Sequence, residues 1–131
     1  MSMTSYHWGN RSLQRLKLVH PRLVTVVTLA LRQFARADMT VVEGLRDIQT
    51  QMEYVERGVS WTMNSKHLAQ DDGYAHAVDI APWIDGRIPW EDHEAFKAMS
   101  EDVFKAAYHL GYVITWGGNW PNRKDGPHFQ L

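Results

Sequence analysis

One stretch decides how this chain is organised: Ala77-Val78-Asp79-Ile80-Ala81. Its small and β-branched apolar residues are typical of a strand that is buried in a core. Asp79 is the exception, because a carboxylate flanked by Val78 and Ile80 loses its hydration on burial and needs a partner. A metal ion is one such partner, and a hydrogen-bond donor is another. The stretch therefore predicts a central strand and marks Asp79 as a candidate site residue.

Helices are expected on both sides of this strand. Apolar residues recur every three or four positions after Pro21, a residue suited to the first helical position. Asp47 is a candidate N-cap, and Gly58 and Gly111 are placed to end helices. The expected helices cover residues 13–19, 21–34, 48–57 and 91–110.

Several short strands complete the pattern. The stretches 39–43, 112–116 and 128–131 predict strands, and Asp85-Gly86 predicts a two-residue hairpin turn. These strands do not alternate regularly with helices, which favours an α+β fold with a small antiparallel sheet packed against three or four helices. Residues 59–75 show no periodicity, and an irregular segment of this length in a small domain is usually functional or mobile.

The composition narrows the range of functions. A chain of 131 residues is expected to form one domain, residues 1–131. Its net charge of -1 provides no broad positive field, which argues against nucleic acid and against stable membrane association. The absence of cysteine excludes disulfides, iron–sulfur clusters and thiol catalysis, and leaves the 7 histidines and the carboxylates as strong metal ligands. No secretory signal is visible, and the apolar stretch 23–31 is too short to span a bilayer.

The main chemical signal is a set of two histidines and one aspartate: His67, Asp79 and His128. A catalytic zinc ion typically has three protein ligands of these types and leaves a fourth position open. Spacing alone leaves a second interpretation, in which the histidines are ordinary loop and terminal residues and Asp79 is a hydrogen-bonded strand carboxylate.

The motifs around these residues resemble a known family. They are Ser65-Lys66-His67, residues 77–82 (AVDIAP) and residues 125–129 (DGPHF), supported by residues 41–46 (VVEGLR) and 116–120 (WGGNW). Their order resembles the zinc-binding signature of the D-Ala-D-Ala carboxypeptidase (VanY-like) metallopeptidases. Within that family the chain is most similar to single-domain phage endolysins of the L-alanyl-D-glutamate peptidase type, whose fold places a zinc site at the sheet.

The resemblance implies a role for each matching residue. It assigns zinc ligands at His67, Asp79 and His128, a catalytic carboxylate at Asp125, and substrate binding or polarisation at Arg46. Without the resemblance, Asp125 would be an ordinary turn residue and Arg46 a surface partner of a neighbouring carboxylate, Glu43 or Asp47.

Two departures from the family pattern concern the metal site. Residues 68–75 lengthen the gap between His67 and Asp79 and make His76 a rival ligand, although the Ser-Lys-His context favours His67. Gln130 stands where related chains often carry Glu, and it is expected to lie outside the metal shell.

Other conspicuous residues have simpler explanations. His7, His20, His93 and His109 lack a carboxylate at ligand spacing and are expected to be structural or exposed. Residues 71–73 (DDG) lack the rest of a calcium-binding loop and are expected to be solvated. The tryptophans at 116 and 120 are expected to pack in the protein or, alternatively, to form a wall of the substrate groove.

The resemblance implies a zinc peptidase that cleaves the peptide stem of bacterial peptidoglycan, most specifically between L-Ala and D-Glu. The alternatives are a D-Ala-D-Ala carboxypeptidase on the same fold and a non-catalytic cell-wall-binding module. The enzyme is expected to act as a monomer without a separate wall-binding domain. It would be made in the host cytoplasm without a signal peptide, and a separate membrane-permeabilising protein would let it reach the wall.

Overall fold

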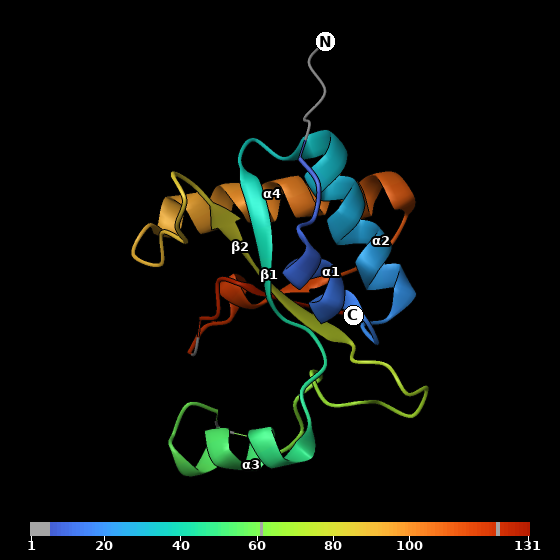
Figure 1. The fold of residues 1–131 in the computed structure, drawn as a ribbon, viewed down its shortest axis with the longest axis vertical. Coiled ribbons are helices and arrows are strands. Elements are labelled where there is room, and N and C mark those ends of the chain that lie inside the picture. The colour runs from blue at the N-terminus through green and yellow to red at the C-terminus, as the bar shows by residue number, and fades with distance from the viewer. Residues whose placement is uncertain (1–5, 61, 123) are drawn as a thin grey trace.

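A four-stranded antiparallel sheet lies at the centre of the computed structural model, which describes residues 6–60, 62–122 and 124–131 (Figure 1). The strands are β1 (Asp38–Glu43), β2 (Ala77–Trp83), β3 (Thr115–Trp116) and β4 (His128–Gln130). Their order in the sheet is β1-β2-β4-β3, and each neighbouring pair is antiparallel. The expected α+β class is confirmed, with residues 77–81 at the heart of the sheet.

Four α-helices surround or flank the sheet: α1 (Asn10–Leu16), α2 (Pro21–Leu29), α3 (Ile48–Glu56) and α4 (His93–Leu110). The Asp47 side chain accepts a hydrogen bond from the amide of Thr50 at the start of α3, as expected of an N-cap. Gly111 ends α4 in the left-handed conformation that glycine adopts without strain. Helix α1 lies three residues earlier than predicted, and α2 continues into a π-helical turn, Ala30–Phe34, that the sequence pattern did not reveal.

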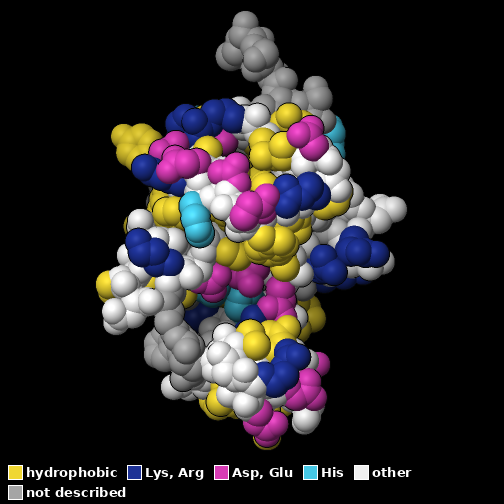
Figure 2. All heavy atoms as spheres, turned by 90° about the vertical axis from the view of Figure 1, so that its left-hand side faces the viewer, with side chains coloured by type: hydrophobic (Ala, Val, Ile, Leu, Met, Phe, Trp, Pro, Cys, Tyr) yellow, Lys and Arg dark blue, Asp and Glu magenta, His cyan; other side chains and the backbone are white. Residues whose placement is uncertain are grey.

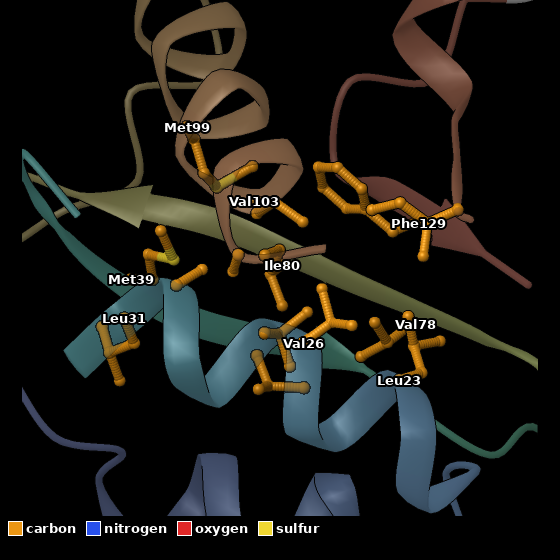
Figure 3. Packing of buried hydrophobic residues seen from close by; sticks show 14 of the residues in the cluster. Leu23, Val26, Leu31, Met39, Val78, Ile80, Met99, Val103 and Phe129 are labelled. Atoms are coloured by element: carbon orange, nitrogen blue, oxygen red, sulfur yellow. The ribbon is translucent and has the colours of Figure 1, made fainter. Parts of the chain in front are cut away.

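The core lies on one face of the sheet, because alternate side chains of a strand point to opposite faces. Val78 and Ile80 of β2 pack with Leu23 of α2, Val103 of α4 and Phe129 of β4 (Figure 3). All five of these side chains are completely buried. Asp79 and His128, one position away from these core residues, are thereby directed to the other face.

Residues 45–64 form a lobe around α3 that stands apart from this core (Figure 1). Among the described residues, the hydrophobic cluster includes none from this segment, which we call the α3 lobe. Arg46 instead joins this lobe to the sheet through its hydrogen bonds to Glu43 and Gln51. No helix in the described ranges has the length and apolar character needed to cross a membrane.

Candidate metal and catalytic site

Asp79 and His128 are brought together by strand pairing. They are register partners in the antiparallel pair β2–β4, and side chains that are opposite each other across such a pair lie close together on the same face. His128 Nδ1 lies 3.2 Å from Asp79 Oδ1. The sheet therefore fixes two of the predicted ligands.

His67 reaches the same carboxylate oxygen from the loop that follows the α3 lobe. Its Nε2 lies 3.0 Å from Asp79 Oδ1, and its Nδ1 lies 2.8 Å from the carbonyl oxygen of Gly44. The side chain is buried, and its ring lies edge-on to that of His128 with 5.1 Å between centroids. His67, Asp79 and His128 thus offer ligand atoms within 4.8 Å of one another.

The outer hydrogen bonds of the two histidines show what kind of group fits between them. The Gly44 carbonyl can only accept, so His67 Nδ1 donates to it. His128 Nε2 lies 2.8 Å from Gln130 Oε1 and, with the amide in this orientation, donates to it. In the neutral imidazoles, the nitrogens that face Asp79 then carry lone pairs. Two lone pairs and a carboxylate oxygen repel one another unless a cation lies among them. Such carbonyl partners are typical of metal-bound histidines.

The electrostatics of the cluster agree with this need for a positive charge. Burial opposes the ionisation of Asp79, but hydrogen bonds and positive charge from His128 and His67, which these imidazoles offer only when protonated, outweigh it and lower the Asp79 pKa. Burial likewise disfavours charged His128, but Asp79 raises the His128 pKa above its ordinary value. The cluster therefore favours an ionised carboxylate together with a cation, either a proton or a metal ion.

Asp125 lies beside this cluster without joining it. Its Oδ2 is 3.9 Å from His128 Nδ1, and the side chain is 42% exposed. The backbone fixes it at both ends, since its amide donates to the Gly117 carbonyl at 2.9 Å and its carbonyl accepts from the His128 amide at 3.1 Å. Burial and the negative charge of Asp79 raise the pKa of Asp125. The carboxyl is thus placed to exchange protons near the cluster.

Arg46 is tied to the same site by its backbone and is held by three side chains. Its amide donates to the His67 carbonyl at 2.9 Å. The Nε and Nη2 atoms donate to the two oxygens of Glu43, Nη1 donates to Gln51 Oε1 at 2.6 Å, and the guanidinium lies 4.6 Å from the Tyr54 ring centroid.

These contacts make Arg46 a nearly buried residue. Its side chain is 9% exposed, so the pairing with Glu43 that the sequence left open exists but is not a surface salt bridge. Of the five guanidinium N–H groups, three are used within the described part of the chain, which leaves two for a ligand. Sequence reasoning missed Gln51 and Tyr54, whose roles depend on how α3 is placed.

His76 belongs to a second cluster on the loop 68–76. Its Nε2 lies 2.8 Å from Asp72 Oδ2, and His20 Nε2 lies 3.7 Å from the same oxygen. These residues also meet the spacing for a metal group. However, His20 Nδ1 accepts a hydrogen bond from the Arg22 amide, so in a neutral ring the proton is on Nε2 and points at Asp72. Within this cluster a hydrogen bond joins His76 to Asp72, and the three residues are only partly buried or exposed, in contrast to buried His67 and His128.

A hollow separates the α3 lobe from the rest of the molecule, with acidic, histidine and basic side chains gathered on its floor (Figure 2). The Trp120 ring lies 5.0 Å from that of His128, which places it beside the cluster as a candidate wall. Trp116 instead donates from Nε1 to the Gly126 carbonyl at 2.6 Å and supports the loop that carries Asp125.

Comparisons with known proteins agree with the geometry. The family model described as phage L-alanyl-D-glutamate peptidase matches residues 3–130. The chain is 33% identical over 119 residues to the L-alanyl-D-glutamate peptidase of Escherichia phage T5, a match that covers 88% of this chain and 82% of the relative. It is also similar to the crystal structure of the Serratia marcescens L-Ala D-Glu endopeptidase ChiX, with a TM-score of 0.84, 39% identity, and coverage of 95% and 90% of the two chains.

Proposed function

The chain belongs to the phage L-alanyl-D-glutamate peptidase family, and we propose that it cleaves the L-Ala–D-Glu bond of peptidoglycan with zinc held by His67, Asp79 and His128. The chain is thus an enzyme, a peptidoglycan endopeptidase of the phage endolysin type. The family match favours this activity over a D-Ala-D-Ala carboxypeptidase and over a non-catalytic wall-binding module. Residues from both ends of the chain share one core, which supports a single peptidase domain.

The observation that carries the metal assignment is the arrangement of ligand atoms around Asp79. Two imidazole nitrogens whose outer partners are carbonyl oxygens face one carboxylate oxygen, and this donor set suits zinc. When bound there, zinc would act as a Lewis acid on the scissile carbonyl and would lower the pKa of a water molecule.

Asp125 supplies the proton transfers in this proposal. As the ionised carboxylate, it takes the proton from the water that attacks the L-Ala carbonyl carbon. As the acid so formed, it gives that proton to the nitrogen of D-Glu when the peptide bond breaks. Its raised pKa makes the carboxylate a stronger base and so helps the first step, and its partial exposure leaves room for the substrate.

Arg46 is proposed to bind the substrate near the scissile bond. The peptide stem offers carbonyl and carboxylate oxygens, and the two unused N–H groups of the guanidinium can donate to them. Because Glu43 and Gln51 hold the other side of the guanidinium, its orientation is set before substrate arrives.

Zinc content tests the proposed site directly. The purified protein should hold about one zinc ion per chain, and a chelator should abolish hydrolysis that added zinc restores. His128→Ala should lose the metal. His76→Ala is the matched control, because this histidine belongs to the Asp72 cluster, and it should keep the metal. A His76→Ala variant without zinc, or a His128→Ala variant with it, would contradict the assignment.

A further inference from the structure

Gln51 is a completely buried polar side chain outside the proposed metal and proton-transfer groups. Both ends of its amide are used. Oε1 accepts from Arg46 Nη1 at 2.6 Å, while Nε2 donates to Ser60 Oγ at 2.9 Å and to the Thr62 carbonyl at 2.6 Å. A single side chain therefore joins the arginine at the site to the segment that closes the α3 lobe.

This connection matters because the described residues of the α3 lobe have no place in the hydrophobic core cluster. Within the described ranges, the core cluster contains no residue between β1 and β2. The lobe nevertheless forms one side of the hollow in which acidic, histidine and basic side chains gather (Figure 2). Polar contacts join the lobe to the sheet, since the chain Glu43–Arg46–Gln51 runs from the end of β1 into α3.

We propose that Gln51 is a positioning residue, which orients the Arg46 guanidinium toward substrate and holds the α3 lobe as a wall of the cleft. The inference rests on the proposed function, because it assumes that Arg46 meets the peptide stem there. Gln51 acts through Arg46 and does not itself touch the substrate.

The chemistry of an amide suits this task better than that of a carboxylate or an apolar side chain. An amide offers an acceptor to the guanidinium and donors to Ser60 and Thr62, whereas a carboxylate offers acceptors only. The amide is also neutral. Glu43 already supplies one negative charge to Arg46, and a second carboxylate at position 51 would cancel the attraction of the guanidinium for an anionic substrate group.

The first test measures how Arg46 is held, without reference to activity. Hydrogen bonds on both Nη1 and Nη2 restrict rotation of the guanidinium, so the wild-type protein should show separate nitrogen NMR signals for these atoms. Gln51→Met removes the Nη1 acceptor but leaves the two bonds to Glu43, so the signals should exchange faster than in the wild type. Gln51→Glu keeps an acceptor of the same size and should retain the wild-type exchange rate. Wild-type exchange in a folded Gln51→Met variant, or faster exchange in Gln51→Glu, would overturn the proposal.

The second test measures hydrolysis of a peptidoglycan stem peptide by the zinc-loaded enzyme. Gln51→Met should lower kcat/KM by about 10- to 100-fold, the usual cost of misplacing a binding group, with unchanged zinc content. Gln49→Met, an exposed change on the same helix, is the matched control and should behave as wild type.

A double-mutant cycle then separates positioning from general damage. In an Arg46→Lys background, Gln51→Met should cost less than about 3-fold, because the group that it positions is already lost. An equal loss in both backgrounds would overturn the proposal. An inactive wild-type enzyme would instead refute the proposed function, and the NMR result would remain valid.

Discussion

Gly117→Ala should displace Asp125 and His128, because both residues pack closely against Gly117. A Cβ atom at Gly117 would lie 2.6 Å from the Asp125 carbonyl oxygen and 3.0 Å from the Cβ atoms of both Asp125 and His128. Ordinary contacts begin at 3.4 Å, so these groups would have to move by roughly 0.4–0.8 Å. Backbone atoms cannot rotate away as a flexible side chain can, and the displacement must reach Asp125 and His128 directly.

The expected consequence is a larger loss of catalysis than of stability. Displacements approaching 1 Å at a reacting group cost up to about 100-fold in rate, so kcat should fall by about 10- to 100-fold. Overpacking of this kind typically costs about 1–3 kcal/mol in the free energy of unfolding. Hydrolysis of a stem peptide, zinc content and thermal unfolding would be measured on the same preparation.

Gly126→Ala is the matched control for this prediction. It changes one of the two residues between Asp125 and His128, but the atoms nearest to its added Cβ would be those of the Phe96 side chain, at 3.4 Å or more. Its kcat should stay within about 3-fold of wild type, because an ordinary contact requires little movement. A folded Gly117→Ala enzyme with wild-type kcat would refute the claim that this close packing sets the geometry of the site.

Three further changes test other parts of the account. Asp125→Asn should keep zinc and lower kcat by roughly 10²–10⁴-fold, since the amide cannot accept the proton; wild-type turnover would exclude Asp125 as the base. Arg46→Lys loses the paired contact with Glu43 and the hydrogen bond to Gln51. Both kcat/KM and the free energy of unfolding should therefore fall, the latter by about 1–3 kcal/mol. Unchanged values would show that Arg46 neither binds substrate nor stabilises the α3 lobe. Hydrogen bonds from the Tyr74 amide and His76 lower the pKa of Asp72. The ionised Asp72 carboxylate therefore stabilises the fold above the unfolded-state pKa of about 3.9, and this stabilisation is lost as the pH falls through the lower folded-state pKa. Asp72→Asn should therefore lower Tm at pH ~7 but not at pH ~2; equal effects at both would contradict this.

Local signals in the sequence predicted the elements that position the site. The apolar residues on either side of Asp79 fixed which face of β2 meets the core, and strand alternation then directed Asp79 away from it. The Asp85-Gly86 turn was also predictable, because both residues adopt positive φ there, as a two-residue hairpin turn requires. These features depend on neighbours in the chain, which a sequence displays directly.

Features that depend on contacts with distant parts of the chain were harder to predict from the sequence. The expected strand 112–116 is reduced to Thr115–Trp116, because these two residues are the ones that pair with β4. The choice between His67 and His76 also depended on where the loop 68–75 lies, since Ala75 exchanges backbone hydrogen bonds with Leu18 and His20 and so holds His76 by the α1–α2 connection.

The polar residues that hydrogen-bond to the site residues were the least predictable part of the structure. Nothing in the periodicity of α3 indicates that Gln51 is buried against Arg46, because that burial arises from the long-range placement of the α3 lobe. Gln130 was expected to lie outside the metal shell, and its contact with His128 Nε2 gives it a role in orienting a predicted ligand. Such polar partners are chosen by tertiary geometry, which a single sequence does not reveal.

The central claim is that this chain hydrolyses the L-Ala–D-Glu bond. Purified peptidoglycan digested with the zinc-loaded enzyme should be examined by mass spectrometry for new chain ends. The account predicts new D-Glu amino termini together with L-Ala carboxyl termini, and no such ends after digestion with Asp125→Asn. Release of free D-Ala without new D-Glu amino termini would contradict it.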